Sequence, residues 1–392
     1  MKGCLLFHRG TPWCGTIRGS TNIFAEHFLE TGYHVIWLGA LAHLGQRGSS
    51  RRTSATLHHP RLLEIAPYAP TPWLKHKAAP GWLRLLTTKV AYRAAIPSIA
   101  AAVARHGFPL PQVIWTAGGD AGSLREGFRG SKAIVQCVDL YEAYAGSNII
   151  PVETADYSAA DCVVAIGESL ARFLLAHRGV KPERLQVIGQ GADLRMFSGP
   201  TFEPESIKRA PRPRLVYLGV LDKADPSLMT AALTALPRDT GSLILIGPSS
   251  QWAERLARSD PRVVLCGPMH AQQAANSLRH CDVGLMLYDQ ARPPLQYVGQ
   301  NPLKLYEMAA AGLAIVSTPH DEYQWTRPPV LIVRDYESTV SGVRVAIQRR
   351  KDLSESSLAF AAANSWQNRF CEAEHLVHRL LLDCRPSLAR CS

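Results

Sequence analysis

Short runs of Val, Ile and Leu alternate with longer stretches of mixed polarity along most of the chain. Such runs are typical of strands buried on both faces of a parallel sheet, and the stretches between them suit crossover helices. The pattern therefore predicts successive β-α-β units. In the first half of the chain the predicted strands are residues 3–8, 34–39, 62–67, 112–117, 133–139, 162–167 and 184–189.

The alternation is interrupted once, between residues 190 and 213, by "QGADLRMFSGPTFEPESIKRAPRP". This polar stretch holds four prolines and has no periodic pattern, which is typical of a linker. After residue 335 the pattern predicts helices, and "NSWQNRF" opens the last of them. The strands predicted in the second half are residues 214–219, 242–247, 262–267, 282–287, 313–318 and 330–335.

The chain length agrees with two domains, because 392 residues exceed what one hydrophobic core usually organises. The fold class predicted is α/β, with two Rossmann-like domains that face each other across a cleft. The predicted divisions are a first domain at 1–190, a linker at 191–212, a second domain at 213–364, and a C-terminal helix and tail at 365–392.

Composition adds that the chain is a well-packed protein, with 46% apolar and 19% charged residues. No apolar run approaches the roughly 18 residues of a membrane span, and the first residues are too short for a signal-peptide core. We therefore expect a cytoplasmic protein. The nine cysteines are scattered, without a C-x-x-C pair, and those in "IVQCVD" and "DCVVAIG" read as core residues.

The positive charge is concentrated near the N-terminus. Between Leu41 and Leu110 there are ten Lys or Arg residues against one acid, Glu64, and the stretch "TPWLKHKAAPGWLRLLTTKVAYR" interleaves them with Trp and Tyr. Basic residues alternating with indoles suit an anionic membrane surface or an anionic ligand. A nucleic-acid site and a solvated basic face are the alternatives, and we expect no nucleic-acid partner.

A candidate anion site lies at the start of the predicted helix 302–311. Open α/β sheets bind ligands beyond the carboxyl ends of their strands, and a helix N-terminus there presents free N–H groups to a phosphate. Asn301 is a plausible cap for this helix. The positive charge of Lys304 is unfavourable in the first turn of a helix, unless an anion lies in front of it. Glu307 lies on the same helix face as Lys304, and its carboxylate could accept hydrogen bonds from ribose hydroxyls. The alternative is that Lys304 and Glu307 form a surface ion pair.

Asp139 is the candidate general base. It ends the predicted strand 133–139, which places its carboxylate at the edge where ligands bind. A half-buried carboxylate there suits the role of a general base, which removes a proton from a reacting hydroxyl group. The alternative is that Asp139 caps the loop that follows.

Weaker candidates lie in other loops at the same edges. His8, Arg9, Arg18 and Asn22 flank the first strand-to-helix turn, where a phosphate or an acceptor could be held. Gly118 and Gly119 form a phosphate turn or merely a tight loop, and Asp120 is expected to cap the next helix. His270 either contacts a pyrophosphate or caps its helix. Because the chain has no D-x-D motif, we expect no metal and no other cofactor; because it has no G-x-G-x-x-G, an oxidoreductase or epimerase is disfavoured.

Several of these segments together resemble GT-B glycosyltransferases, especially glycosyltransferase family 4 and its relatives. "NPLKLYEMAAAGLAIVSTP" resembles the signature of Pro, Lys, Glu, a small-residue helix, Gly and a strand. "VIGQGADLRMF" resembles the motif that ends the first domain, and "GPMHAQQAANSLRHCDVGLMLY" the segment that leads into the donor site. "SWQNRF" resembles the helix that crosses back to the first domain. The order of these segments and the lengths of the loops between them look most similar to those of the xanthan-type membrane-associated glucuronosyltransferases.

The resemblance implies a GT-B fold, with the first domain binding the acceptor and the second the nucleotide sugar. It also implies that Asp139 is the catalytic base, that Met269 lies beside the nucleobase, and that the pocket is lined by Tyr288, Leu303, Lys304, Leu305 and Glu307. Pro268 stands where the xanthan-type relatives have an acidic residue. Gln300 and Asn301 stand where retaining family 4 enzymes usually carry another glutamate, which favours inversion.

The function expected from these residues and this resemblance is glycosyl transfer in exopolysaccharide or cell-surface glycan assembly. The donor is a nucleotide diphosphate sugar. We expect the nucleotide to be UDP, and glucuronate is one candidate for the sugar. The acceptor is a lipid-linked or polysaccharide glycan, at the inner face of the plasma membrane. Two alternatives stay open: another nucleotide-sugar enzyme such as an epimerase, and a catalytically dead, membrane-binding homologue.

Overall fold

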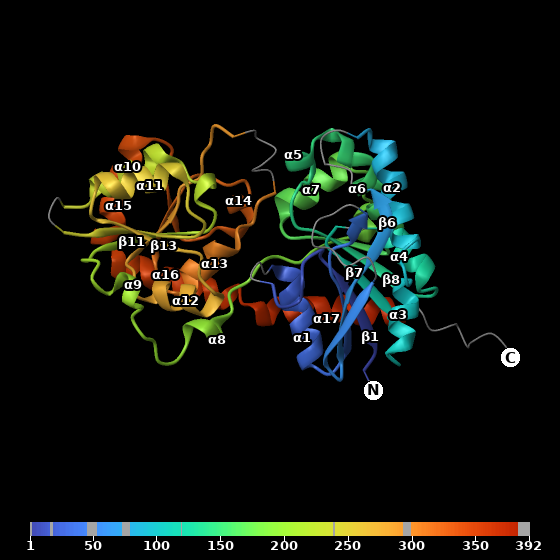
Figure 1. Cartoon of the computed structure of the whole chain (residues 1–392). Coiled ribbons are helices and arrows are strands. Elements are labelled where there is room, and N and C mark those ends of the chain that lie inside the picture. Colours follow the sequence, from blue (N-terminus) through green and yellow to red (C-terminus); the bar gives the residue numbers. More distant parts are fainter. Residues whose placement is uncertain are drawn as a thin grey trace. The chain divides into compact units, whose positions relative to one another are not determined.

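A computed structural model gives the fold, and it describes residues 2–15, 19–44, 53–72, 79–118, 120–237, 240–292 and 299–382. The chain divides into two compact units. The first consists of Met1–Gly189, Val298–Gln300 and Phe370–Ser392, and the second of Gln190–Tyr297 and Asn301–Arg369. Each unit has its own sheet with helices on both sides (Figure 1).

The sheet of the first unit has the order β10-β9-β8-β7-β1-β2-β5-β4 within the described residues, and β3 pairs separately with β6. Neighbouring strands of the large sheet run parallel except β4, which is antiparallel to β5. The strands are β1 (Cys4–His8), β2 (His34–Leu38), β3 (Ala42–Leu44), β4 (Ser54–His59), β5 (Leu62–Ala66), β6 (Tyr68–Pro72), β7 (Val113–Thr116), β8 (Lys132–Cys137), β9 (Cys162–Ala165) and β10 (Leu185–Val187).

Helices cover both faces of this sheet, as the buried strands require. They are α1 (Ser20–Glu30), α2 (Gly81–Arg93), α3 (Ile99–Arg105), α4 (Ala121–Gly127), α5 (Glu142–Ala145), α6 (Ile150–Ala159) and α7 (Glu168–His177), with short 3₁₀ turns η1 (Ser147–Ile149) and η2 (Pro182–Arg184). Asp120 caps α4, as predicted, and its side chain accepts from the Ser123 N–H at 3.0 Å.

The strands predicted from apolar runs are present in the first unit, but β3, β4 and β6 were not predicted and the sheet is not wholly parallel. The reason lies in the residues of β4: Ser54–His59 is polar and largely exposed, so it lacks the apolar run of a central strand. An antiparallel edge strand with one solvated side can be polar in this way. Cys137 and Cys162 are buried core residues, as predicted.

The second unit is a parallel sheet with the order β13-β12-β11-β14-β15-β16 among the described residues. Every predicted strand of this half is present, shortened by one to three residues. The strands are β11 (Arg214–Leu218), β12 (Ser242–Ile246), β13 (Val263–Gly267), β14 (Val283–Met286), β15 (Ala314–Ser317) and β16 (Val330–Ile332). The helices are α8 (Leu194–Phe197), α9 (Glu205–Lys208), α10 (Pro226–Ala235), α11 (Gln251–Ser259), α12 (Ala271–Arg279), α13 (Leu303–Ala310), α14 (Tyr323–Thr326), α15 (Tyr336–Gln348) and α16 (Arg350–Ala363), with the 3₁₀ turn η3 (Leu221–Lys223).

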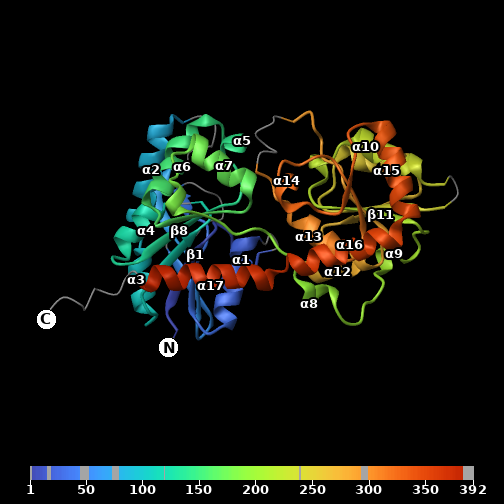
Figure 2. The same cartoon turned by 180° about the vertical axis from the view of Figure 1, so that it is seen from behind.

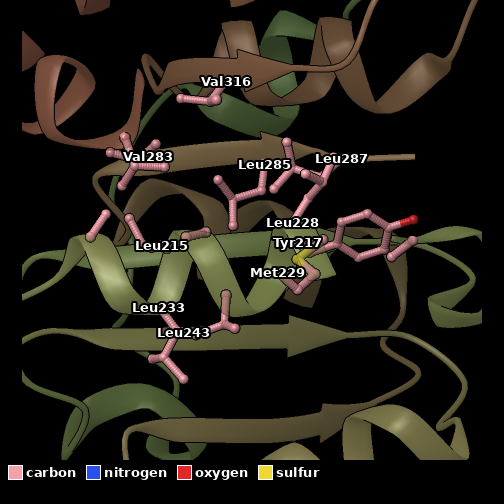
Figure 3. Packing of buried hydrophobic residues seen from close by; sticks show 14 of the residues in the cluster. Leu215, Tyr217, Leu228, Met229, Leu233, Leu243, Val283, Leu285, Leu287 and Val316 are labelled. Carbon is pink, nitrogen blue, oxygen red and sulfur yellow. The ribbon is translucent and has the colours of Figure 1, made fainter. Parts of the chain in front are cut away.

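Alternate residues of these strands enter two hydrophobic cores. Leu215 and Tyr217 of β11 point to the face that α10 covers, where they pack with Met229 (Figure 3). Val216, between them, joins the opposite core, which also contains Leu305 of α13. Strands buried on both faces position their carboxyl ends rigidly, and that edge of the sheet carries the polar residues considered below.

The last helix, α17 (Trp366–Leu382), begins where "NSWQNRF" predicted it. It starts in the second unit and continues in the first, since the division falls between Arg369 and Phe370. Within the first unit α17 lies alongside α1 (Figure 2): His27 stacks on Phe370 with ring centres 3.9 Å apart and contacts Glu374 at 3.0 Å. Among the described residues, no helix combines the length and the apolar character needed to span a bilayer.

Candidate functional site

Helix α13 places its first turn at the carboxyl edge of the second sheet. Its N-cap is Pro302, and no side chain in the described part of the chain accepts a capping hydrogen bond there. The prediction that Asn301 caps the helix is therefore wrong. Asn301 is turned into the protein instead, where its Oδ1 accepts from the Tyr306 hydroxyl at 2.8 Å. Within the described ranges, therefore, no side-chain cap competes with an anion for the N–H groups of the first turn.

Lys304, in that first turn, directs its amine between two aromatic rings. The Nζ lies 4.1 Å from the ring centre of Tyr217 and 4.5 Å from that of Tyr288. These contacts are within the range of cation–π attraction. Gly219, directly after β11, allows the amine to sit there, because a Cβ at this position would lie 3.1 Å from Nζ.

The surroundings of Lys304 disfavour its charge. Burial, and to a smaller extent the neighbouring charge of Lys223, lower the pKa of Lys304 to about 7, and the charge of Glu307 opposes this shift. Burial also raises the pKa of Glu307 to about 7, against the attraction of Lys304. Both side chains are only partly exposed, so they do not form the solvent-exposed surface pair of the alternative interpretation. A desolvated amine with two ring neighbours is poised to gain from an incoming anion.

Backbone hydrogen bonds hold the loops around this amine. Asp225 N–H donates to Leu287 O, and Asp289 N–H donates to Lys223 O, both at 3.0 Å. These bonds join the loop after β11 to the loop after β14. Gly247 closes the packing from β12: it has φ +148°, and a Cβ there would lie 1.9 Å from the Gly219 carbonyl oxygen. Only glycine fits at such an approach.

Two further leucines were expected at this site. Leu303 opens α13 and is partly exposed, as a pocket residue would be. The Leu305 side chain is 1% exposed and belongs to the hydrophobic core under the helix. It therefore supports α13 from below and does not line the surface of the site.

His320 belongs to the same edge and was not predicted. It follows β15, and its ring meets that of Tyr288 edge-on with centres 5.0 Å apart. Burial lowers the pKa of His320 to about 4, and the charge of Lys304 acts in the same direction. No motif in the sequence distinguishes this histidine; only the strand order, which brings β15 beside β14, shows its place.

Met269 and His270 lie after β13, at the other side of the same sheet. Met269 lines a surface pocket of about 460 Å³ together with Pro268, Phe202 and Gln273. His270 is the N-cap residue of α12 by position, but its side chain makes no capping hydrogen bond. The capping alternative for His270 is thus wrong.

In the first unit, two of the candidates at the first strand-to-helix turn, Arg9 and Asn22, lie in contact. Arg9 Nη1 donates to Asn22 Oδ1 at 2.6 Å, and the same oxygen accepts from the Gly19 N–H at 3.2 Å. Burial lowers the pKa of Arg9, while Tyr141 and Asp139 oppose that shift, so both lie within electrostatic range. Arg18 and Gly119, which were also candidates, lie outside the described residues.

Asp139 lies two residues beyond the end of β8, which stops at Cys137, and not at the end of the strand as predicted. It is partly buried. Tyr141, not Asp139, occupies the N-cap of α5. The Tyr141 hydroxyl donates to the Ala117 carbonyl at 3.1 Å, which fixes the loop after β8 against the loop after β7. The structure therefore gathers Asp139, Arg9 and Tyr141 at one edge of the first sheet.

His8, in contrast, is removed from this chemistry. It is buried, with Nδ1 2.8 Å from the Leu38 carbonyl and Nε2 2.5 Å from the Tyr92 hydroxyl. Burial lowers the pKa of His8 to about 4, so it serves as a neutral core residue. Among the described residues, no group of three or more His, Cys, Asp or Glu side chains is arranged to hold a metal ion.

The sequence matches no protein-family model and no curated protein. Solved structures are similar over nearly the whole chain. Sucrose-phosphate synthase from Thermosynechococcus elongatus has a TM-score of 0.69 at 18% identity, with 98% of this chain and 100% of that chain covered. HepE from Anabaena, solved in complex with UDP, has a TM-score of 0.63 at 14% identity, with 97% of this chain and 100% of that chain covered. Trehalose-6-phosphate synthase, which transfers a glycosyl group with retention, has a TM-score of 0.65 at 13% identity, with 96% of this chain and 99% of that chain covered.

These likenesses define the fold. The two α/β units of this chain have the GT-B architecture, as the resemblance in the sequence implied. At such low identity the likeness concerns the arrangement of helices and strands.

Proposed function

We propose that this protein is a glycosyltransferase that takes a sugar from a nucleotide diphosphate donor. The observation that carries the proposal is the Lys304 amine, held between Tyr217 and Tyr288 in the first turn of α13, whose N-cap residue Pro302 has no side-chain acceptor. A partly buried amine beside a helix N-terminus at the carboxyl edge of a parallel sheet suits a diphosphate. The leaving diphosphate needs positive charge as its bond to the sugar breaks, and Lys304 supplies it.

Within this proposal the donor is a UDP-sugar, bound by the second unit. HepE, whose fold is similar, has been solved with UDP and with UDP-glucose, which supports testing uridine donors first. Glu307, one turn beyond Lys304, would accept from the ribose hydroxyls, and Met269 would lie beside the base. Glucuronate belongs in the donor panel because the sequence resembles the xanthan-type glucuronosyltransferases.

Asp139 is proposed as the base of an inverting transfer. The acceptor hydroxyl gives its proton to the Asp139 carboxylate as its oxygen bonds to the anomeric carbon. The bond from that carbon to the phosphate oxygen breaks, and UDP leaves with the electron pair. The partly buried position of Asp139 beside Arg9 supports this role. Retention in trehalose-6-phosphate synthase does not decide the outcome here, since Gln300 and Asn301 provide no second glutamate.

We further propose that the acceptor is a lipid-linked glycan and that helix α2 contacts an anionic membrane at the inner face of the plasma membrane. Trp82, Leu86 and Val90 follow one another at intervals of four residues and are 67%, 51% and 41% exposed. Residues at this spacing share one helix face. A ridge of exposed apolar side chains on a basic segment suits the interface of an anionic bilayer. The part of the predicted segment at 73–78 lies outside the described residues.

A thermal-shift panel tests the function. A ligand that binds the folded state alone raises stability by about 2.7 kcal/mol at one hundred times its Kd. We expect UDP and at least one of UDP-glucose, UDP-galactose, UDP-glucuronate and UDP-N-acetylglucosamine to raise Tm. NAD⁺, which a Rossmann oxidoreductase or an epimerase would bind, serves as the control. A shift with NAD⁺ and none with any nucleotide sugar would overturn the proposal, and UDP binding without turnover on lipid-linked acceptors would favour a dead homologue.

A further inference from the structure

His320 is a buried side chain whose hydrogen-bonding groups are not used by the protein. It is 7% exposed, and neither Nδ1 nor Nε2 has a hydrogen-bond partner within the described residues. Buried polar atoms are nearly always paired, and those that are not often mark a place where a ligand or water belongs. Two unpaired nitrogens on one ring make His320 the clearest such case in the second unit.

The position of His320 joins it to the candidate diphosphate site. Its ring lies edge-on against Tyr288, 5.0 Å between centres, and Tyr288 in turn lies under the Lys304 amine. On its other side His320 meets the ring of Tyr323 at 5.1 Å. The strands that carry this group, β11, β14 and β15, are consecutive neighbours in the sheet, so Gly219, Tyr288 and His320 follow one another along a single edge.

We propose that His320 hydrogen-bonds the hydroxyl groups of the donor's sugar, and that it determines which sugar this site accepts. The inference rests on the proposed function, because it takes the diphosphate beside Lys304 as given. It goes beyond the proposed function because it names the residue that contacts the glycosyl group of the donor.

The chemistry of the ring favours a sugar over a phosphate. The surroundings described above keep the imidazole neutral at pH 7, so it offers one N–H donor and one lone-pair acceptor. A phosphate oxygen accepts hydrogen bonds but has no proton to give, and would leave the acceptor nitrogen of His320 unpaired. A hydroxyl group both donates and accepts. A sugar hydroxyl can therefore pair with whichever ring nitrogen faces it, whereas a phosphate oxygen can pair only with the N–H.

Titration calorimetry with UDP and with the UDP-sugar that gives the largest thermal shift tests this. We compare the wild type with His320→Ala and with His320→Asn, which keeps a polar group, and measure Tm to verify folding. His280→Ala is the matched control: this partly exposed histidine of the same unit lies after α12 and contacts Thr201 at 3.3 Å. We expect His320→Ala to bind UDP within about twofold of the wild type and the UDP-sugar about 5- to 150-fold more weakly, the range for leaving a buried sugar hydroxyl without its hydrogen-bond partner.

Each other outcome counts against the inference in its own way. Equal weakening of UDP and UDP-sugar would place His320 on the nucleotide or in a structural role. Unchanged affinity for both ligands in a folded variant would mean that buried water, not a sugar, satisfies the ring. Loss equal to that of His280→Ala would make the effect unspecific. A wild type that binds neither ligand would overturn the proposed function, and this inference with it.

Discussion

Replacing Lys304 by Met should stabilise the free protein while it removes a ligand contact. Met keeps the length of the side chain and its packing between Tyr217 and Tyr288 but takes away the charge. A pKa lowered from 10.5 to about 7 corresponds to about 5 kcal/mol against the charged form. That figure is an upper bound, because the side chain is partly exposed and because the two rings return about 0.5–2 kcal/mol through cation–π attraction.

We expect a gain of about 1–3 kcal/mol at pH 6, or about 2–4 °C in Tm per kcal/mol for a unit of this size. The pH dependence has a definite sign. Between pH 7 and 10.5 the folded state binds fewer protons at Lys304 than the unfolded state, so wild-type stability rises with pH in that window. The advantage of Lys304→Met should therefore be complete below pH 7 and should shrink as pH approaches 10.5.

Thermal unfolding at pH 6 and at pH 10, without ligand, measures both quantities. Lys208→Met is the matched control, since Lys208 lies in α9 of the same unit with a 61% exposed side chain, and changes at such sites are usually within about 0.5 kcal/mol. A Lys304→Met protein that is less stable than the wild type at pH 6 would refute the reasoning. So would a gain that is the same at both pH values, because the desolvated charge would then not be its source.

Three further predictions concern the ligand, the chemistry and the membrane. At pH 8 a free Lys304 amine with a pKa of about 7 is about one-tenth protonated, so UDP binding should take up about 0.9 proton, seen as a dependence of binding enthalpy on buffer; no uptake would contradict it. Asp139→Asn should retain UDP affinity and lower turnover by about 10²–10⁴, and the wild-type product should have an inverted anomeric centre by NMR coupling; retention, or near-wild-type turnover, would remove Asp139 as the base. The protein should float with phosphatidylglycerol vesicles at low salt but not with neutral ones, and Trp82→Ala should reduce this; equal binding to both vesicles would refute the electrostatic part.

The fold was largely predictable because strands buried on both faces must be apolar throughout. The second sheet shows this, since β11 and β14 lie at its centre and the residues 215–218 and 283–286 form apolar runs. β4 shows the limit of the same signal, because an exposed edge strand needs no apolar run. The end of β8 was misplaced by two residues since Val138 continues the apolar run beyond the last paired residue.

The site was predictable where its residues are close in sequence. Lys304 and Glu307 could be read from one helix because its N-terminus and charge pattern are local features. Tyr217 and His320 could not, because the first belongs to β11 and the second follows β15, and only strand order brings them to the same amine. The prediction that Asn301 caps α13 was wrong for a related reason. Its side chain accepts a hydrogen bond from the Tyr306 hydroxyl, and this contact overrides the local capping preference.

Titration of UDP into the wild type and into Lys304→Met at pH 7 measures directly what Lys304 contributes to UDP binding. We predict that the wild type binds UDP and that the variant, although more stable, binds it with about 1.5–3 kcal/mol less free energy, the contribution of a charge-assisted hydrogen bond. Unchanged UDP affinity in the folded variant, or a wild type that binds no UDP, would contradict the claim that Lys304 and the N-terminus of α13 hold the diphosphate of a sugar donor.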